Sequence, residues 1–283
     1  SAAYYLAIKG HGVTVFDMMP KMGGMLRYGI PQYRLPKEVL DKEIAIIEKL
    51  GVKMINGVKL GKDFTVASLK AQNDAVIVAV GAWKSSSMRT PGEELNGIYG
   101  GIDFLRAVAL KQEINIGDKV VICGGGNTAM DACRTAVRLG AKEVYCVYRR
   151  TRNEMPAEDI EITEAEEEGV QFKFLTNPIS FNGKDGKVKS VTLQLMELGE
   201  PDASGRRRPV AIEGKTEELD VDSVIIAIGQ KLVNEDVSEL KLTDRGNIEA
   251  DIDTFKTNIE GVFAIGDLSL IHISEPTRHL RIS

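Results

Sequence analysis

A short glycine-rich segment, Gly124 to Ala129, directly follows an apolar run and directly precedes a helical pattern. The apolar run, Lys119 to Cys123, is typical of a strand that is buried on both faces. Asn127 to Leu139 has apolar residues at helical spacing and is followed by Gly140, a typical helix stop. A strand, a tight loop and a helix in this order constrain the chain to an α/β fold.

Small residues occupy three positions of this segment, Gly124, Gly126 and Ala129, in a GxGxxA pattern. Gly124 permits a tight turn, Gly126 leaves room for backbone to approach a pyrophosphate, and Ala129 lets helix and strand pack closely. The helix presents unpaired N–H groups and a partial positive charge to phosphates. We therefore expect a dinucleotide site here. A turn of this composition that binds nothing is the alternative.

The second strand of such a unit is expected at Val144 to Tyr148, and its end is where the adenosine ribose is recognised. A site for NAD usually carries Asp or Glu there, whereas this chain carries Arg149 and Arg150, with Arg152 close behind. Guanidinium groups suit a 2′-phosphate, so the sequence favours NADPH over NADH. A surface patch of arginines without a ligand is the alternative.

Other segments continue the alternation of buried strands and helices, which predicts the α/β fold class. Lys37 to Leu50 is expected to be a helix because its apolar residues recur at helical spacing before Gly51. Phe172 to Leu198 contains the turn "NGKDG" and predicts an antiparallel hairpin laid over a parallel sheet. Three further apolar runs are expected to be buried strands: Val13–Phe16, Ala75–Val80 and Val224–Ile228.

The composition is that of a soluble globular protein, with 283 residues, 43% hydrophobic residues and a mean hydropathy of -0.11. No apolar run approaches the roughly 20 residues of a membrane helix, which argues against a membrane partner. The formal net charge of -5 argues against a nucleic-acid partner. The acidic run Glu164 to Glu168 and the basic run "GRRR", Gly205 to Arg208, are expected to be solvated faces or turns.

Three cysteines, Cys123, Cys133 and Cys146, form no CxxC pair and fit no zinc or iron–sulfur spacing. We expect each to be a small buried residue, no metal site, and a reducing, cytoplasmic location. The missing CxxC pair disfavours a disulfide reductase of the thioredoxin reductase type. Outside residues 268–283, His11 is the only histidine, so a catalytic mechanism that depends on histidine has almost no material here. We therefore expect no catalytic side chain.

The first residues, "SAAYYLAIKGHGVTVFD", predict a helix, a turn and a strand that ends at Asp17. These are the later parts of a second dinucleotide-binding unit, in which Asp17 is placed to bind ribose hydroxyls. The first strand and glycine loop of that unit would lie before Ser1. We therefore expect the chain as it stands to hold this second nucleotide poorly.

Three further motifs surround the Gly124 segment: "GGMLRYGIPQYRLPKEVL" from Gly23, "DAVIVAVGA" from Asp74 and "GVFAIGD" from Gly261. Together with "VYRRTRNEMPA", "GEPDASGRRR" and "VIIAIGQ", they resemble the glutamate synthase small (beta) subunit family. That group of two-dinucleotide flavoprotein reductases also includes the NADPH-binding subunits of ferredoxin-dependent transhydrogenases and the amino-terminal half of dihydropyrimidine dehydrogenase. The resemblance covers Ser1 to Asp267.

The resemblance implies two Rossmann-like domains, with an NADPH domain inserted in a split FAD domain, and an antiparallel β layer. The FAD domain is expected over residues 1–108 and 236–267, and the NADPH domain over 109–235. The residues implied for FAD are Asp17, Gly23, Gly24, Leu26, Arg27, Ala79, Val80, Gly81, Gly266 and Asp267. Those implied for NADPH are Gly124, Gly126, Asn127, Thr128, Ala129, Arg149 and Arg150, with Gly229 near the meeting point of the two cofactors.

Three features depart from the family pattern. Asp17 replaces the more usual Glu, although its shorter side chain can still accept hydrogen bonds from ribose hydroxyls. The cysteine-rich amino-terminal region that holds iron–sulfur clusters in the family is absent from this sequence. After Asp267, the strings "LSLIHISEPTR" and "HLRIS", residues 268–283, resemble the translation of a sequencing-library adapter and not the family's flavin-supporting helix.

The resemblance implies hydride transfer from NADPH to FAD, followed by release of electrons to the iron–sulfur clusters of a partner. The partner expected is the glutamate synthase large subunit or another iron–sulfur electron-acceptor subunit. A ferredoxin:NADP transhydrogenase subunit or a dihydropyrimidine dehydrogenase-like reductase would carry the same motifs. A non-catalytic NADPH-binding module is the alternative from a different class.

Overall fold

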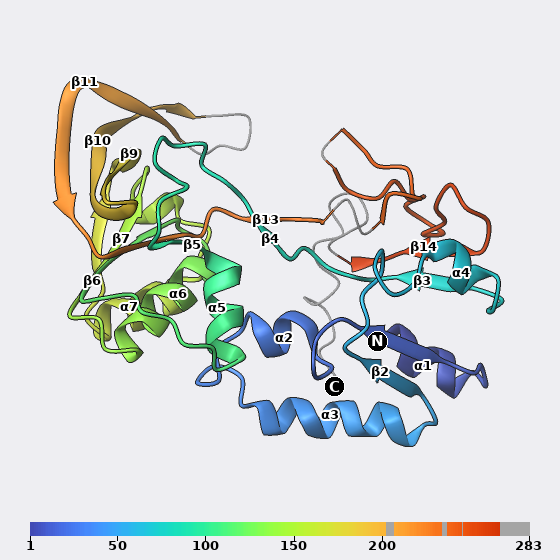
Figure 1. Cartoon of the computed structure of the whole chain (residues 1–283). Coiled ribbons are helices and arrows are strands. Elements are labelled where there is room, and N and C mark those ends of the chain that lie inside the picture. Colours follow the sequence, from blue (N-terminus) through green and yellow to red (C-terminus); the bar gives the residue numbers. More distant parts are fainter. Residues whose placement is uncertain (202–206, 234–236, 245, 267–283) are drawn as a thin grey trace. The chain divides into compact units, whose positions relative to one another are not determined.

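The computed structural model describes residues 1–201, 207–233, 237–244 and 246–266, and the chain folds into two compact units (Figure 1). The unit that we call outer, because its segments flank the other in sequence, comprises Ser1–Arg27, Leu35–Lys84 and the described residues from Lys231 onward. The central unit comprises Tyr28–Arg34 and Ser85–Gln230. One unit is thus inserted in the sequence of the other, in agreement with the expected split fold.

The main breaks between the units follow Lys84 and precede Lys231, and not residues 109 and 236 as the sequence suggested. β5 (Ile98–Gly100) pairs with β12 (Ser223–Ile226), so the residues from Ser85 onward belong with the central sheet. On the return, Leu232 lies in the core of the outer unit. Apolar packing therefore divides the chain at points that its motifs do not mark.

Five parallel strands form the sheet of the central unit, in the order β5-β12-β6-β7-β8 within the described residues. The remaining strands are β6 (Lys119–Cys123), β7 (Glu143–Tyr148) and β8 (Gln171–Phe174). β6 has the bounds that the sequence predicted, and β7 begins one residue earlier. The buried, apolar residues of β6 and β12 are typical of strands that are covered on both faces.

Alternate residues of β6 contribute to two different cores. Val120 and Ile122 belong to a core shared with the helices α5 (Gly101–Ala109), α6 (Asn127–Arg138) and α7 (Asp159–Glu167). Val121 and Cys123 belong to a second core, shared with the antiparallel strands described next. Because successive side chains of a strand point to opposite faces, the sheet has helices on one face and a second sheet on the other.

The second sheet contains β9 (Thr176–Lys184), β10 (Lys187–Pro201) and β11 (Arg207–Asp220) in antiparallel pairing. Asp185 and Gly186 form the β9–β10 turn with positive φ angles, which confirms a hairpin at "NGKDG". The start predicted for this hairpin was wrong, because Phe172 belongs to β8 in the parallel sheet.

Two separate parallel pairs make up the strands of the outer unit in the described part of the chain. β1 (Thr14–Asp17) pairs with β2 (Lys53–Asn56), and β3 (Val76–Val78) pairs with β14 (Val262–Ala264). The helices in the first part of the chain are α1 (Ala2–Ile8), α2 (Gly24–Tyr28), α3 (Lys37–Lys49) and α4 (Val66–Lys70). One further short pair, β4 (Lys84–Ser85) and β13 (Gln230–Lys231), lies at two of the points where the chain passes from one unit to the other.

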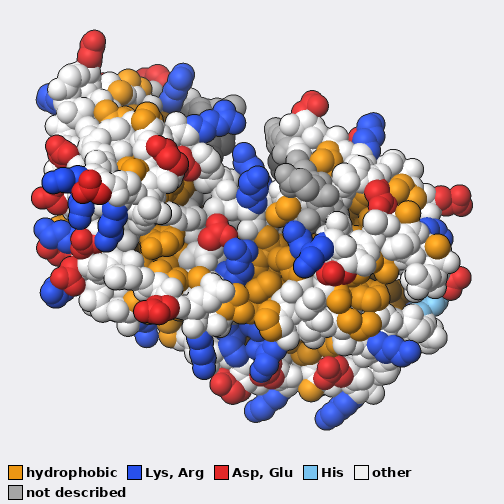
Figure 2. Space-filling view, in the orientation of Figure 1, with side chains coloured by type: hydrophobic (Ala, Val, Ile, Leu, Met, Phe, Trp, Pro, Cys, Tyr) orange, Lys and Arg blue, Asp and Glu red, His pale blue; other side chains and the backbone are white. Residues whose placement is uncertain are grey.

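Basic and acidic side chains are intermixed on the face drawn in Figure 2. This distribution accords with a sequence that has 36 Lys and Arg against 41 Asp and Glu. Among the helices that the structure describes, none has the length and apolar character needed to cross a bilayer.

Candidate functional site

Gly124 follows β6 directly and occupies a position that no other residue fits. Its φ angle is +150°, and a Cβ there would lie 2.3 Å from the carbonyl oxygen of Ala227, which follows β12. The Gly124 N–H donates to the carbonyl of Val147 on β7 (3.1 Å). The turn is therefore held between the ends of two neighbouring strands, and glycine is required by this close approach.

Gly126 is the N-cap of α6 and is open where Gly124 is crowded. A Cβ at Gly126 would meet only the Pro156 side chain, at 3.8 Å. No side chain caps this end of the 12-residue helix, so the first N–H groups, those of Asn127 and Thr128, lack intrahelical partners. Open space in front of free N–H groups at a helix N-terminus fits the pyrophosphate of a dinucleotide.

Of the residues that follow the turn, Asn127 is exposed, Thr128 is partly buried and Ala129 is buried. Asn127 accepts a hydrogen bond at Oδ1 from the Glu158 N–H (3.1 Å), which ties the start of α6 to the start of α7. Ala129 is fully buried, and its Cβ would lie 3.3 Å from a Cβ at Gly124. The three small residues thus have the spatial roles predicted from the pattern. Asn127 and Thr128 offer backbone groups here.

Arg149 and Arg150, predicted as a pair, lie in different environments at the end of β7. Arg149 is exposed and makes no hydrogen bond or ion pair with any residue that the structure describes. Arg150 is only 7% exposed, and its Nε donates to the carbonyl oxygen of Arg207 on β11 (2.7 Å). The sequence could not distinguish the two because the partner of Arg150 is 57 residues away.

Gly229 lies beyond the end of β12 with a φ angle of +119°, and its carbonyl accepts a hydrogen bond from the Ser86 N–H (3.0 Å). Beside it, a cavity of about 150 Å³ opens at the ends of β5 and β12. Sequence reasoning missed this cavity, and the only signal for it was the run of three serines. It is lined by Ser85, Ser86, Ser87, Glu93, Ile98, Tyr99, Gly100, Asp103 and Ile226.

Asp17 ends β1 in the outer unit, as predicted. Its Oδ1 accepts a hydrogen bond from the Met19 N–H (2.8 Å). Burial raises the pKa of this half-buried carboxyl group, and the bond from Met19 only partly offsets the effect. A half-buried carboxylate at a strand end can accept hydrogen bonds from ribose hydroxyls.

The segment at the start of α2 contains four predicted residues, and the structure separates their roles. Gly23 has a φ angle of +132°, and a Cβ there would lie 2.8 Å from the side chain of Leu40. Gly24 has open space around it, and Leu26 is 49% exposed. Arg27 is buried and is engaged within the unit, because its guanidinium bonds the carbonyl of Met22 (2.6 Å) and the carboxylate of Asp41. Leu26 is therefore better placed than Arg27 to touch a ligand.

The predicted turn Ala79–Gly81 and the predicted Gly266 follow two strands that pair with each other, β3 and β14. The Ile265 N–H donates to the carbonyl of Val78 (3.1 Å), so the two strand ends lie side by side. The Trp83 side chain donates to the carbonyl of Val80 (2.7 Å) and closes the turn. Carboxyl ends of adjacent parallel strands are where α/β folds bind ligands. Asp267 and residues 268–283 lie outside the described residues.

All three cysteines are buried and free, as predicted. Burial raises the pKa of the thiols of Cys123 and Cys133. Reactive cysteines need accessible thiolates, so these residues are unsuited to thiol–disulfide chemistry.

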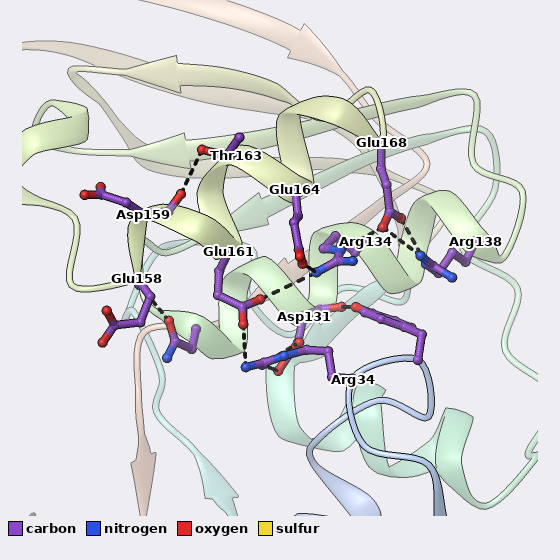
Figure 3. A network of polar contacts seen from close by, with 12 residues as sticks. Arg34, Asp131, Arg134, Arg138, Glu158, Asp159, Glu161, Thr163, Glu164 and Glu168 are labelled. Carbon is purple, nitrogen blue, oxygen red and sulfur yellow. Dashed lines mark hydrogen bonds and ion pairs between the residues drawn. The ribbon is translucent and has the colours of Figure 1, made fainter. Parts of the chain in front are cut away.

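The acidic run Glu164 to Glu168, at the end of α7, is only in part the solvated face that the sequence suggested: Glu166 and Glu167 are exposed, but two other members are paired with α6 (Figure 3). Glu164 and Glu168 both pair with Arg134 of α6, and Glu168 also pairs with Arg138 at 2.7 Å. Glu161, one turn earlier, pairs with Arg34 at 2.5 Å. The helices behind the glycine turn are thus joined by ion pairs that the local sequence pattern did not reveal.

A family model and several known proteins match the sequence of this chain. The family model described as pyridine nucleotide-disulphide oxidoreductase matches residues 1–280. The chain is 44% identical over 277 residues to a protein of Moorella thermoacetica named NADP(+)-dependent formate dehydrogenase subunit beta, which covers 95% of this chain and 39% of that protein. It is 38% identical over 287 residues to the glutamate synthase [NADPH] small chain of Azospirillum brasilense, which covers 95% of this chain and 59% of that one.

Solved structures share the fold at lower identity. Mycobacterium tuberculosis FprA in complex with NADPH superposes with a TM-score of 0.78 at 21% identity, over 95% of this chain and 75% of that one. A Lactococcus lactis thioredoxin reductase gives 0.70 at 23% identity, over 96% of this chain and 87% of that one. The chain spans less than two thirds of the length of the two sequence relatives described above. The family match over nearly the whole chain shows that it belongs to the pyridine nucleotide-disulphide oxidoreductase family.

Proposed function

We propose that this chain is the cofactor-binding part of a flavoprotein oxidoreductase that passes hydride from NADPH to FAD and then electrons to the iron–sulfur clusters of a partner. The observation that carries the proposal is the Gly124–Gly126 turn. Gly124 is required by the packing, and Gly126 leaves open space before an uncapped helix N-terminus. This combination fits a dinucleotide pyrophosphate.

NADPH would be held by the backbone of the turn and of the first residues of α6, Asn127 and Thr128. Arg149 is the charged group we assign to the 2′-phosphate, because it is exposed at the end of β7. Gly229 and the serine-lined cavity beside it lie at the ends of neighbouring strands of the same sheet. They are suited to the far end of an extended dinucleotide.

FAD would be held in the outer unit. Asp17 would accept hydrogen bonds from ribose hydroxyls, and the turn Ala79–Gly81 together with Gly266 would present backbone at two adjacent strand ends. When bound, the flavin supplies the chemistry of accepting a hydride and releasing single electrons. The protein's own contribution is to bind and orient the two cofactors. No side chain of the described residues is assigned a proton-transfer role.

The partner we propose is the large subunit of glutamate synthase, because a glutamate synthase small chain aligns with 95% of this chain. Another iron–sulfur electron-acceptor subunit is the alternative. It is favoured by the higher identity, 44%, to a protein named as a formate dehydrogenase beta subunit. The three buried free cysteines support a cytoplasmic setting in either case.

An anaerobic titration tests the hydride step. The chain would be extended at its amino end by a strand and glycine loop of the expected kind, loaded with FAD and titrated with NADPH and with NADH. The proposal predicts that NADPH bleaches the visible absorbance of the flavin, and that NADH does so much less. A protein that binds NADPH without reducing bound FAD would instead be a non-catalytic NADPH-binding module.

A further inference from the structure

Of the two arginines expected at the 2′-phosphate of NADPH, only Arg149 has a guanidinium that is exposed and unpaired among the described residues. A phosphate monoester carries close to two negative charges, and its recognition usually involves several charge-assisted hydrogen bonds. Arg150, in contrast, is only 7% exposed and donates a hydrogen bond to the backbone carbonyl of Arg207. A second cationic side chain for this phosphate could come from the segments that contact the end of β7.

The Arg150–Arg207 hydrogen bond attaches a second basic segment to the end of β7. At 2.7 Å, it fixes the first residue of β11 against the residue that follows Arg149. The backbone of Arg150 is also fixed, since its carbonyl accepts from the Leu175 N–H (3.1 Å). The basic start of β11 is thus attached to the end of β7, where the ribose is recognised.

Two arginines begin β11, and their side chains differ. Arg207 remains on its own hairpin, because its Nε and Nη2 donate to the carbonyls of Gly199 (3.2 Å) and Leu198 (2.6 Å). Arg208 is on the opposite face of the strand, since successive side chains alternate. It is exposed and makes no hydrogen bond or ion pair with any residue in the described ranges.

Carboxylate pairing sets Arg149 and Arg208 apart from other arginines of the central unit. Arg134, Arg138 and Arg152 all have carboxylate partners. Arg149 and Arg208 have none among the described residues, although the Arg150–Arg207 bond holds their segments together. Two guanidinium groups without protein anions, on segments that one hydrogen bond joins, are suited to an anion from outside the protein.

We propose that Arg208 is a second ligand of the NADPH 2′-phosphate, and that Arg150 is a positioning residue that holds β11 in place for it. The proposal rests on the proposed function, because it assumes that NADPH binds at the Gly124 turn. It gives the basic run that begins β11 a role in cofactor choice. Arg150 contributes to the choice of NADPH through the position of Arg208 and does not itself contact the cofactor.

The test compares NADPH and NADH affinities of the chain as it stands by calorimetric titration. The variants are Arg208→Met, Arg150→Met and the double variant. Arg89→Met is the control, because Arg89 is an exposed arginine of the same unit without an ion pair among the described residues. We expect Arg208→Met to weaken NADPH about tenfold, the effect of losing one charge-assisted contact, and to leave NADH unchanged.

Arg150→Met should have the same selective effect, and the double variant should be no weaker than either single one, because both act on one contact. Arg89→Met should bind NADPH normally. Unchanged NADPH binding by Arg208→Met, or an equal loss of NADPH and NADH, would overturn the proposal. If Arg150→Met does not fold, Arg208→Met decides alone, since Arg208 is exposed. If the unsubstituted chain does not prefer NADPH, the proposed function itself fails.

Discussion

Arg34 donates from Nη1 to both carboxylate oxygens of Asp131, at 3.0 and 2.8 Å, although 97 residues separate them in sequence. The same guanidinium pairs with Glu161 of α7 at 2.5 Å. The neighbouring Tyr33 ring lies against the guanidinium groups of Arg134 and Arg138, 4.6 and 4.0 Å from its centroid. These contacts explain why Tyr28–Arg34 belongs to the central unit while the residues on both sides belong to the outer unit.

Arg34→Met should destabilise the central unit strongly, because it removes a partner from a buried carboxylate. The Asp131 side chain is only 6% exposed, and breaking a buried pair in this way costs about 3–5 kcal/mol. Asp131→Asn removes the buried charge itself, so it should destabilise the unit clearly less than Arg34→Met does. The free energies of unfolding in urea would be compared with those of Lys142→Met. That control loses an exposed pair with Asp118, which screening by water makes weak. Equal losses for Arg34→Met and Lys142→Met would contradict the account.

The stability of the central unit should depend on pH through Asp131. Burial raises the pKa of this carboxyl to about 6 from its usual 3.8, and the bonds from Arg34 only partly offset the burial. The folded state therefore binds the proton more tightly than the unfolded state does. Between pH 6 and about 4 this group contributes stability that grows as the pH falls, by about 1.4 kcal/mol per pH unit.

Urea unfolding of the unsubstituted chain and of Asp131→Asn at several pH values isolates that contribution. The unsubstituted chain should gain stability relative to the variant as the pH falls from 6 to about 4. A relative loss over the same range would mean that the pKa of Asp131 is lowered in the folded state.

Alanine at Gly124 should act mainly on the stability of the fold, and alanine at Gly126 mainly on NADPH binding. Gly124→Ala places a Cβ 2.3 Å from the Ala227 carbonyl at a φ of +150°, so it should destabilise the fold by at least about 1–3 kcal/mol. Gly126→Ala has open space and should cost about 1 kcal/mol or less as an N-cap change. Gly126→Ala should still weaken NADPH binding, because the added methyl lies where the pyrophosphate approaches. Full NADPH affinity in folded Gly126→Ala would place the pyrophosphate elsewhere.

The three cysteines should be unreactive in the folded protein. Cys123, Cys133 and Cys146 are buried, and burial raises the pKa of the first two thiols, which suppresses the thiolate. Ellman's reagent should therefore release colour only after denaturant is added, and then for three thiols. A fast-reacting thiol in the native chain would reopen a thiol–disulfide function for this fold.

The sequence predicted those parts of the fold in which local pattern and packing agree. β6 and α6 were located because a buried strand, small residues and a helix follow one another directly, and Gly124, Gly126 and Ala129 have the environments that their sizes implied. Local pattern could not predict partners far away in sequence. Arg150 bonds Arg207, and Arg34 bonds Asp131, through folding that brings distant segments together. For the same reason the boundary at Lys84 was missed, since it depends on β5 pairing with β12.

The central claim is that NADPH binds at the Gly124 turn with its 2′-phosphate at Arg149. The most direct test is calorimetric titration of the chain with NADPH and with NADH, for the unsubstituted protein and for Arg149→Ala. The account predicts a clear preference for NADPH that Arg149→Ala largely removes, with NADH affinity unchanged. Equal affinities of the unsubstituted chain for the two nucleotides, or a preference that survives Arg149→Ala in full, would contradict it.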